Sequence, residues 1–155
     1  PDGGPATSLG GLRMTPDYAA DRLPAQCAGV VLAGGMDWDK PEAEKIAGIV
    51  EEARRRGLPV GAICNAVSFL AAHGFLNEVR HTGNTAEMLQ KWGGERYTGA
   101  ARYEERQAVR DGGMVTANGT GYLEFSREYL LALGADEPEA IAAWYEFSKH
   151  GIYKQ

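Results

Sequence analysis

The sequence has 155 residues, enough for one domain with a core of its own, and we expect residues 1–155 to form a single domain. A net charge of -5 disfavours a nucleic-acid-binding surface. No apolar run approaches the roughly twenty residues that span a bilayer, so no membrane partner is expected. The start lacks a signal-peptide pattern and the two cysteines are expected to be reduced thiols, so the predicted location is cytoplasmic.

Short segments separated by glycines open the chain. Residues 1–18 predict an extended hairpin or edge strands rather than a helix. Residues 28–35, AGVVLAGG, form a short apolar run closed by a glycine pair, which predicts a buried parallel strand. Asp39 is then expected to cap a helix that has Pro41 in its first turn and that ends at Gly57.

A second apolar run, residues 59–63, stops at Cys64. From Asn65 onward the apolar residues recur at helical spacing until Gly74. A strand that turns at once into a helix holds its corner residue at the carboxyl edge of the sheet, in the arrangement called a nucleophile elbow. The helix start also favours a thiolate over a thiol. The sequence therefore predicts Cys64 as a catalytic nucleophile, and a small buried core residue is the alternative.

The second half of the chain alternates helices with a hairpin. Asn84, followed by Glu87, resembles a capping box at the start of a helix. Residues 105–109 and 114–118 flank a turn, which predicts two antiparallel strands. Two more helices are expected, with faces for the core or a dimer contact that carry Tyr122, Phe125, Tyr129, Leu130, Leu133 and Trp144.

Strand, helix, strand is the order of a right-handed βαβ unit, which places the loop after the first strand beside Cys64. Gly34 and Gly35 would allow a close backbone approach there, and a backbone N–H of this pair would join that of Asn65 in an oxyanion hole. A simple strand-ending turn is the alternative. Asn118 follows a strand and is a candidate for the rim of the same pocket or a plain loop residue.

Four segments, in this order, resemble the ThiJ/PfpI family of the class I glutamine amidotransferase-like superfamily: VVLAGG (30–35), VGAICNA (60–66), TANGTGYLEF (116–125) and WYEFSKHGI (144–152). The resemblance implies an α/β fold, a flavodoxin-like three-layer sandwich with a mostly parallel sheet. It also implies a homodimer. Members of this family use the elbow cysteine in peptidase, amidase, isonitrile hydratase, glyoxalase-like or deglycase activities, and no cofactor is implied.

The sequence departs from the family pattern in three places. The usual opening strand, helix and strand are absent, which predicts an N-terminally short domain without the glutamate that the family's first helix supplies to the cysteine. Asn65 stands where peptidase-type members have a histidine, which disfavours a peptidase. His81 is a candidate base for Cys64 or a polar loop residue, and one residue of slip on a strand would turn it to the opposite face.

The leading functional prediction is a cysteine-dependent hydrolase or lyase that acts on a small carbonyl, amide or nitrile-like substrate. One alternative is a redox-sensing or stress-response protein that uses the same cysteine without turnover. Another is a catalytically silent member. No grouping of Cys and His has zinc spacing, so no metal is expected.

Overall fold

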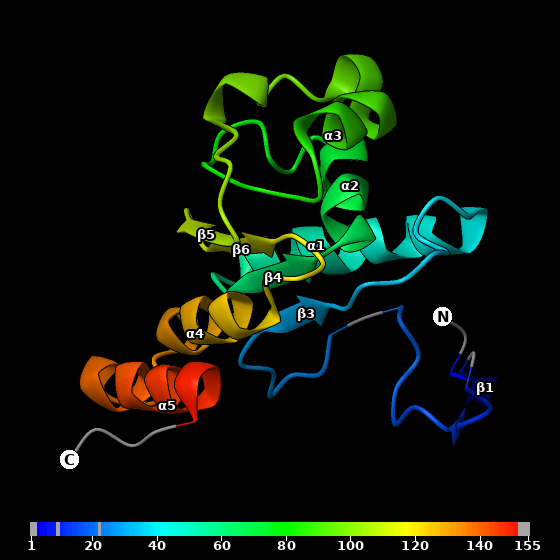
Figure 1. Ribbon diagram of the computed structural model, residues 1–155. Coiled ribbons are helices and arrows are strands. Elements are labelled where there is room, and N and C mark those ends of the chain that lie inside the picture. Colours follow the sequence, from blue (N-terminus) through cyan, green and yellow to red (C-terminus); the bar gives the residue numbers. More distant parts are fainter. Residues whose placement is uncertain (1–2, 9, 22, 152–155) are drawn as a thin grey trace.

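The centre of the fold is a sheet with the strand order β3-β4-β6-β5 (Figure 1). The computed structural model describes residues 3–8, 10–21 and 23–151. Three neighbouring strands run parallel, and β5 pairs with β6 antiparallel. The strands are β3 (Val30–Leu32), β4 (Val60–Ile63), β5 (Ala108–Asp111) and β6 (Met114–Ala117). The sheet is therefore mostly parallel, as predicted.

The α-helices are α1 (Lys45–Arg55), α2 (Asn65–Ala72), α3 (Ala86–Gly93), α4 (Tyr122–Leu133) and α5 (Pro138–His150), with short 3-10 helices η1 (Pro41–Glu44), η2 (Gly94–Arg96) and η3 (Ala100–Arg102). In Figure 1, α4 and α5 lie on the opposite side of the sheet from α2 and α3. None of the helices in the described part of the chain is long and apolar enough to cross a lipid bilayer. The layers form the expected α/β sandwich.

A small antiparallel hairpin opens the described chain. Strand β1 (Ala6–Thr7) pairs with β2 (Arg13–Met14), which confirms the predicted hairpin. Residues 1, 2 and 9 of the predicted stretch lie outside the described residues. In Figure 1 this hairpin lies apart from the four-stranded sheet, so its strands are not edge strands of that sheet.

Alternation along β4 divides the core between the two faces of the sheet. Val60 and Ala62 belong to a large cluster that includes residues of α1, α2 and α3. Ile63 packs with a smaller cluster that contains Val115 and Phe125. Because side chains alternate between faces along a strand, one short apolar run serves both cores. That double burial explains why the run carries no polar residue.

Gly61 lets α4 lie directly on the central strand. A Cβ atom at Gly61 would stand 2.7 Å from Cζ of Phe125 and 2.8 Å from Cδ2 of Tyr129. The two rings stack with their centroids 5.7 Å apart. No side chain larger than hydrogen fits between the strand and this aromatic pair.

The predicted cap at Asp39 is wrong. Lys40 is the residue at the helix start, with extended dihedrals of φ -83° and ψ 150°, and no side chain caps it. Pro41 disfavours helical dihedrals for the residue before it, so Lys40 takes the boundary position. Pro41 itself stands in the first turn, as predicted.

Two aromatic residues predicted for a core or a dimer contact lie at the surface of this chain. Tyr122 is 63% exposed and Trp144 is 39% exposed. Helix α5 buries Ile141 and Tyr145 instead, and Tyr145 donates a hydrogen bond to Glu124 of α4. The periodic spacing of apolar residues predicted α4 and α5 correctly. Each helix, however, buries fewer of its apolar side chains than the spacing implied.

Candidate active site

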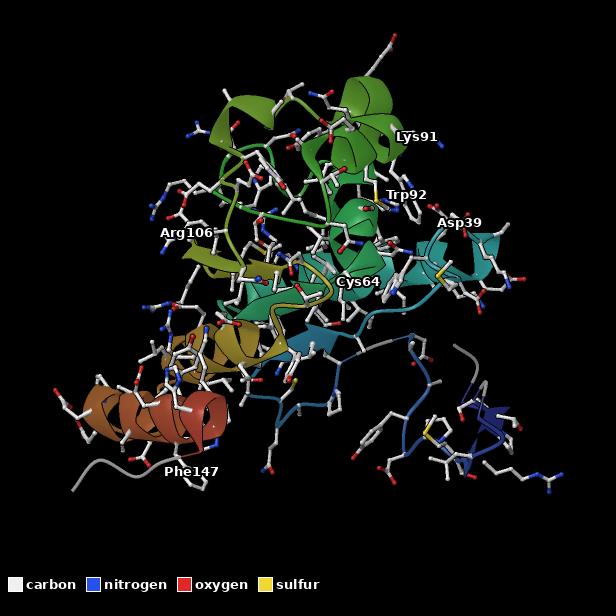
Figure 2. The ribbon with its side chains drawn as sticks, in the orientation of Figure 1. Asp39, Cys64, Lys91, Trp92, Arg106 and Phe147 are labelled. Carbon is white, nitrogen blue, oxygen red and sulfur yellow. The ribbon has the colours of Figure 1, made fainter. Side chains whose placement is uncertain are left out.

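Cys64 occupies the predicted corner between β4 and α2, where Figure 2 labels it. Its dihedrals are φ 62° and ψ -132°, and it is the one non-glycine residue with positive φ in the described chain. Its N–H donates to the carbonyl of Ala117 at 3.0 Å, and its carbonyl accepts from Val67 at 3.0 Å. Such a conformation costs about 1–3 kcal/mol and persists only where the surroundings enforce it. Strand and helix enforce it here.

Two glycines lie against the half-buried side chain of Cys64. A Cβ atom at Gly34 would stand 3.1 Å from Cβ of Cys64 and 3.8 Å from its Sγ. A Cβ atom at Gly119 would stand 3.3 Å from the same Sγ. The loops after β3 and β6 therefore converge on the sulfur, and both approach it through a residue without a side chain.

Asn65 is the first residue of α2 and lies almost entirely inside the protein. Its backbone N–H has no acceptor within the helix, because the first N–H groups of a helix never do. Its Nδ2 lies 3.9 Å from Sδ of Met36, and its Oδ1 accepts from Asn84 at 3.2 Å. The N–H that the sequence assigned to an oxyanion hole thus belongs to a residue whose side chain is fixed.

Asn84 does not cap α3, contrary to the prediction. Thr85 is the N-cap, and its hydroxyl accepts from the N–H of Met88 at 3.1 Å. Asn84 instead donates through Nδ2 to Sγ of Cys64 at 3.5 Å and accepts through Oδ1 from the N–H of Gly119 at 2.9 Å. Asn84 and Thr85 are both residue types that favour the N-cap, and only one of them can occupy it. This succession of two capping residues is the sequence signal that could have indicated another role for Asn84.

His81 is fully buried, and both of its ring nitrogens have partners. Nδ1 lies 2.8 Å from the carbonyl oxygen of Val79, and Nε2 lies 2.6 Å from the hydroxyl of Tyr97. A carbonyl only accepts, so Nδ1 carries the proton and Nε2 accepts from Tyr97. Burial lowers the pKa of His81 and raises that of Tyr97 to about 12, which keeps both groups neutral. The proposed role as base for Cys64 has no supporting contact among the described residues.

Burial of His81 predicts a dependence of stability on pH. Its folded-state pKa lies below the ordinary histidine value of about 6.5, so the unfolded chain binds this proton more tightly. The contribution of neutral His81 to the free energy of unfolding is complete above about pH 6.5 and is lost as the pH falls below that value. Urea unfolding should therefore show a larger loss of stability on acidification for the wild type than for His81→Gln. An identical loss in both proteins would contradict this.

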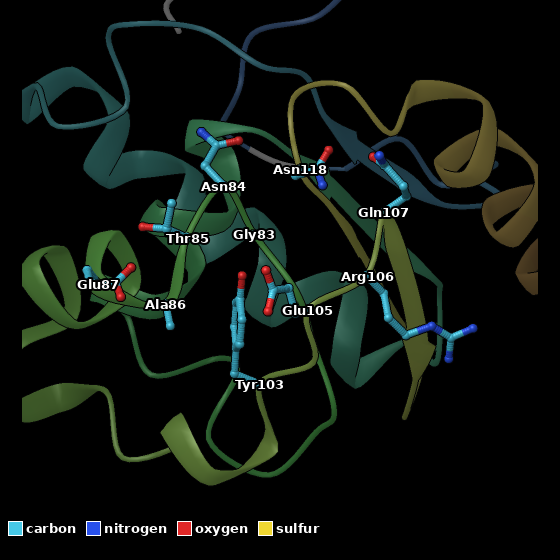
Figure 3. A pocket seen from close by; sticks show the side chains of 10 residues that line it. All are labelled: Gly83, Asn84, Thr85, Ala86, Glu87, Tyr103, Glu105, Arg106, Gln107 and Asn118. Atoms are coloured by element: carbon cyan, nitrogen blue, oxygen red, sulfur yellow. The ribbon is translucent and has the colours of Figure 1, made fainter.

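A polar cavity of 480 Å³ has Asn84, the residue that contacts Cys64, in its wall (Figure 3). Its walls come from the loop before α3, the start of α3, the segment that leads into β5 and the loop after β6. They comprise Gly83, Asn84, Thr85, Ala86, Glu87, Tyr103, Glu105, Arg106, Gln107 and Asn118. Figure 3 shows the hydroxyl end of Tyr103 directed toward Asn84 and Gly83. Asn84 is thus shared between the cavity wall and the sulfur.

Asn118 lines this cavity, at the rim position that the sequence suggested. Its Oδ1 accepts from the backbone N–H of Thr120 at 3.1 Å and from the hydroxyl of Thr120 at 2.9 Å. Its own N–H donates to the carbonyl of Gln107 at 3.2 Å. Asn118 therefore shapes the loop that carries Gly119 to the sulfur.

Among the described residues, no group of three or more His, Cys, Asp or Glu side chains is placed to hold a metal ion. Cys27, the other thiol, donates to the carbonyl of Gly29 at 3.1 Å. The arrangement at Cys64 can support nucleophilic chemistry, because an amide donor lies at the sulfur and the residue that supplies it, Asn84, also lines a polar cavity.

The chain resembles known proteins over most of its length. The sequence pattern of the DJ-1/PfpI family matches residues 1–132. The "Uncharacterized protease YdeA" of Bacillus subtilis (strain 168) is 35% identical over 147 residues, which are 95% of this chain and 73% of that protein.

Two solved structures resemble the fold closely. The DJ-1 superfamily protein Atu0886 of Agrobacterium tumefaciens is 40% identical, with a TM-score of 0.85 over 98% of this chain and 81% of its own. A thiJ/pfpI family protein from Bacillus anthracis is 32% identical, with a TM-score of 0.89 over 97% of this chain and 71% of its own. Sequence and architecture therefore lead to the same group of proteins.

Proposed function

Because this chain belongs to the DJ-1/PfpI family, we propose that it is a cysteine-dependent hydrolase or lyase acting on a small carbonyl, amide or nitrile-like substrate. The observation that carries the proposal is the strained corner at Cys64, whose half-buried sulfur receives a hydrogen bond from Asn84. Strain of this kind gathers at active sites, where it presents a reactive atom. A core cysteine would need no such conformation.

The proposed reaction begins with the thiolate of Cys64. It bonds to the electrophilic carbon, and the π electron pair moves onto the carbonyl oxygen. With an amide, the oxyanion then collapses, the C–N bond breaks, and the amine leaves with a proton from solvent. Water adds to the resulting thioester, and the thiolate departs as the acid product forms. No cofactor enters this sequence of steps.

The oxyanion would be held by the backbone N–H groups of Gly35 and Asn65. Support comes from Gly34, which packs against Cys64 and so brings the adjoining peptide to the sulfur. Support also comes from the place of Asn65 at the first position of α2, where the N–H and the helix dipole both face the developing charge. Loss of either peptide orientation would slow the addition step.

Small substrates fit the site better than long peptides. The cavity beside Asn84 measures 480 Å³, the size of a small-molecule pocket. The related YdeA protein bears the name of a protease. In this chain, Asn65 rather than a histidine follows the nucleophile, and His81 is occupied by Val79 and Tyr97. We therefore assign the hydrolase chemistry to small molecules.

A substrate panel with selective thiol blocking tests the proposal. Glyoxals, amides and isonitriles are offered to the protein during partial alkylation with iodoacetamide, and peptide mass mapping reports the modified fraction of each cysteine. Turnover should fall in proportion to modification of Cys64 and should be independent of Cys27. Turnover that survives complete alkylation of Cys64 would overturn the mechanism. Peroxide oxidation of Cys64 in a protein that turns over no compound would favour redox sensing instead.

A further inference from the structure

We propose that Asn84 is the residue that binds and positions the thiolate, a role that rests on Cys64 being the proposed nucleophile. Its Nδ2 donates both to Sγ of Cys64 at 3.5 Å and to Oδ1 of Asn65 at 3.2 Å. Its Oδ1 accepts from the N–H of Gly119 at 2.9 Å. One side chain thus joins the loop before α3 to the cysteine corner and to the loop after β6.

The orientation of the Asn84 amide follows from its partners. The N–H of Gly119 is a donor and needs an oxygen, so Oδ1 must face the loop after β6. Nδ2 is then the atom that faces the sulfur, and its other partner, Oδ1 of Asn65, accepts a hydrogen bond from it. The amide therefore presents a donor to Cys64, and a donor stabilises a thiolate more than a thiol.

The same side chain fixes the distance between the sulfur and its neighbours. Gly119 lies so close to Sγ that a Cβ atom there would be 3.3 Å away, and the hydrogen bond that its N–H donates to Asn84 holds it in that place. Thr85 takes over the capping of α3, which leaves both polar atoms of Asn84 to the site. Asn84 thus combines an electrostatic role with a positioning role.

Two substitutions separate those roles. Asn84→Asp keeps an oxygen for the N–H of Gly119 but replaces the donor at the sulfur with a negative charge. Asn84→Ala removes both contacts. If donation to the thiolate is the function, alkylation of Cys64 at neutral pH should slow about tenfold in Asn84→Ala and about a hundredfold in Asn84→Asp. The midpoint of the pH–rate profile should move to higher pH in the same order.

The measurement is the iodoacetamide rate at each cysteine, followed by peptide mass mapping across the pH range in which thiols ionise. Cys27 serves as the internal reference, and its rate should stay constant. Asn77→Ala is the matched control, because Asn77 also joins two loops, donating to Arg96 and accepting from Thr98, each at 2.9 Å. Its Cys64 profile should equal that of the wild type.

The outcomes are distinct. If Asn84 only positions the loops, Cys64 should be alkylated more slowly in Asn84→Ala than in Asn84→Asp. If both variants keep the wild-type pH–rate profile, Asn84 has no role at the thiolate. Either result overturns the proposal. Circular dichroism confirms that each variant is folded before its rates are compared. The test needs no substrate, so a shifted thiol profile together with turnover that survives blocking of Cys64 would uphold Asn84 and reject the proposed function.

Discussion

Cys64→Gly is expected to abolish turnover and yet to unfold less readily than Cys64→Ala. Either substitution removes the nucleophile, so the rate with any substrate should fall by at least about a thousandfold. Alanine must keep the strained corner at φ 62°, whereas glycine adopts positive φ without strain. Glycine relieves about 1–3 kcal/mol of backbone strain, but it also adds conformational entropy to the unfolded chain. The free energy of unfolding of Cys64→Gly should therefore exceed that of Cys64→Ala by about 1 kcal/mol.

Urea unfolding of the two variants, together with the wild type, measures this difference. Cys64→Ser is a further control, because serine keeps the strain and the shape of the side chain while lowering nucleophilicity. If the alanine variant proves at least as stable as the glycine variant, the corner is not strained in solution. Turnover that remains in any of the three variants would remove Cys64 from the mechanism.

Gly61→Ala should destabilise the fold, because it places a methyl group between β4 and α4. The new Cβ would approach Cζ of Phe125 to 2.7 Å and Cδ2 of Tyr129 to 2.8 Å, so α4 has to move away from β4. Overpacking of a tight core costs about 1–3 kcal/mol, and a contact with two stacked rings belongs at the upper end, about 3 kcal/mol. The melting temperature should fall by about 10 °C.

Gly48→Ala is the matched control for this substitution. Gly48 lies in α1, is exposed, and has no atom within 4 Å of the position that a Cβ would take. Alanine should stabilise the helix there by about 0.5–1 kcal/mol. Opposite signs at Gly61 and Gly48 are therefore expected in thermal unfolding. A wild-type melting temperature for Gly61→Ala would mean that α4 does not pack on β4 as described.

Local patterns in the sequence predicted the fold. The apolar run that became β4 was short and unbroken because both faces of the sheet are covered there. The run that became β3 lies at the edge of the sheet and is buried on one face only, since Val31 is 50% exposed. The hairpin of β5 and β6 was marked by its glycine turn, and Gly112 and Gly113 both have positive φ. These features depend on residues close together in the sequence, so one sequence sufficed.

The errors arose where two local rules competed. Asp39 is a good capping residue, but Pro41 sets the boundary at Lys40. Asn84 and Thr85 both favour the cap position, and Thr85 occupies it. In each case the sequence contains both signals, and nothing in the pattern alone ranks them.

The site was predictable only in part. Cys64, Asn65 and Gly34 follow from a strand that turns into a helix and from its parallel neighbour. The closeness of Gly119 depends on the pairing of β4 with β6, which joins residues more than fifty positions apart along the chain. Tyr97 was hidden as a partner of His81 for a similar reason, since it reaches the histidine from another loop.

The backbone of Cys64 belongs to two elements at once. Its N–H continues the ladder to β6, and its carbonyl begins the first turn of α2. Any breathing motion that separates sheet from helix would break one of these bonds and carry the sulfur with it. Displacement of the sulfur is therefore limited by the sheet and the helix together, and rotation about the Cα–Cβ bond is the freedom that remains to the side chain.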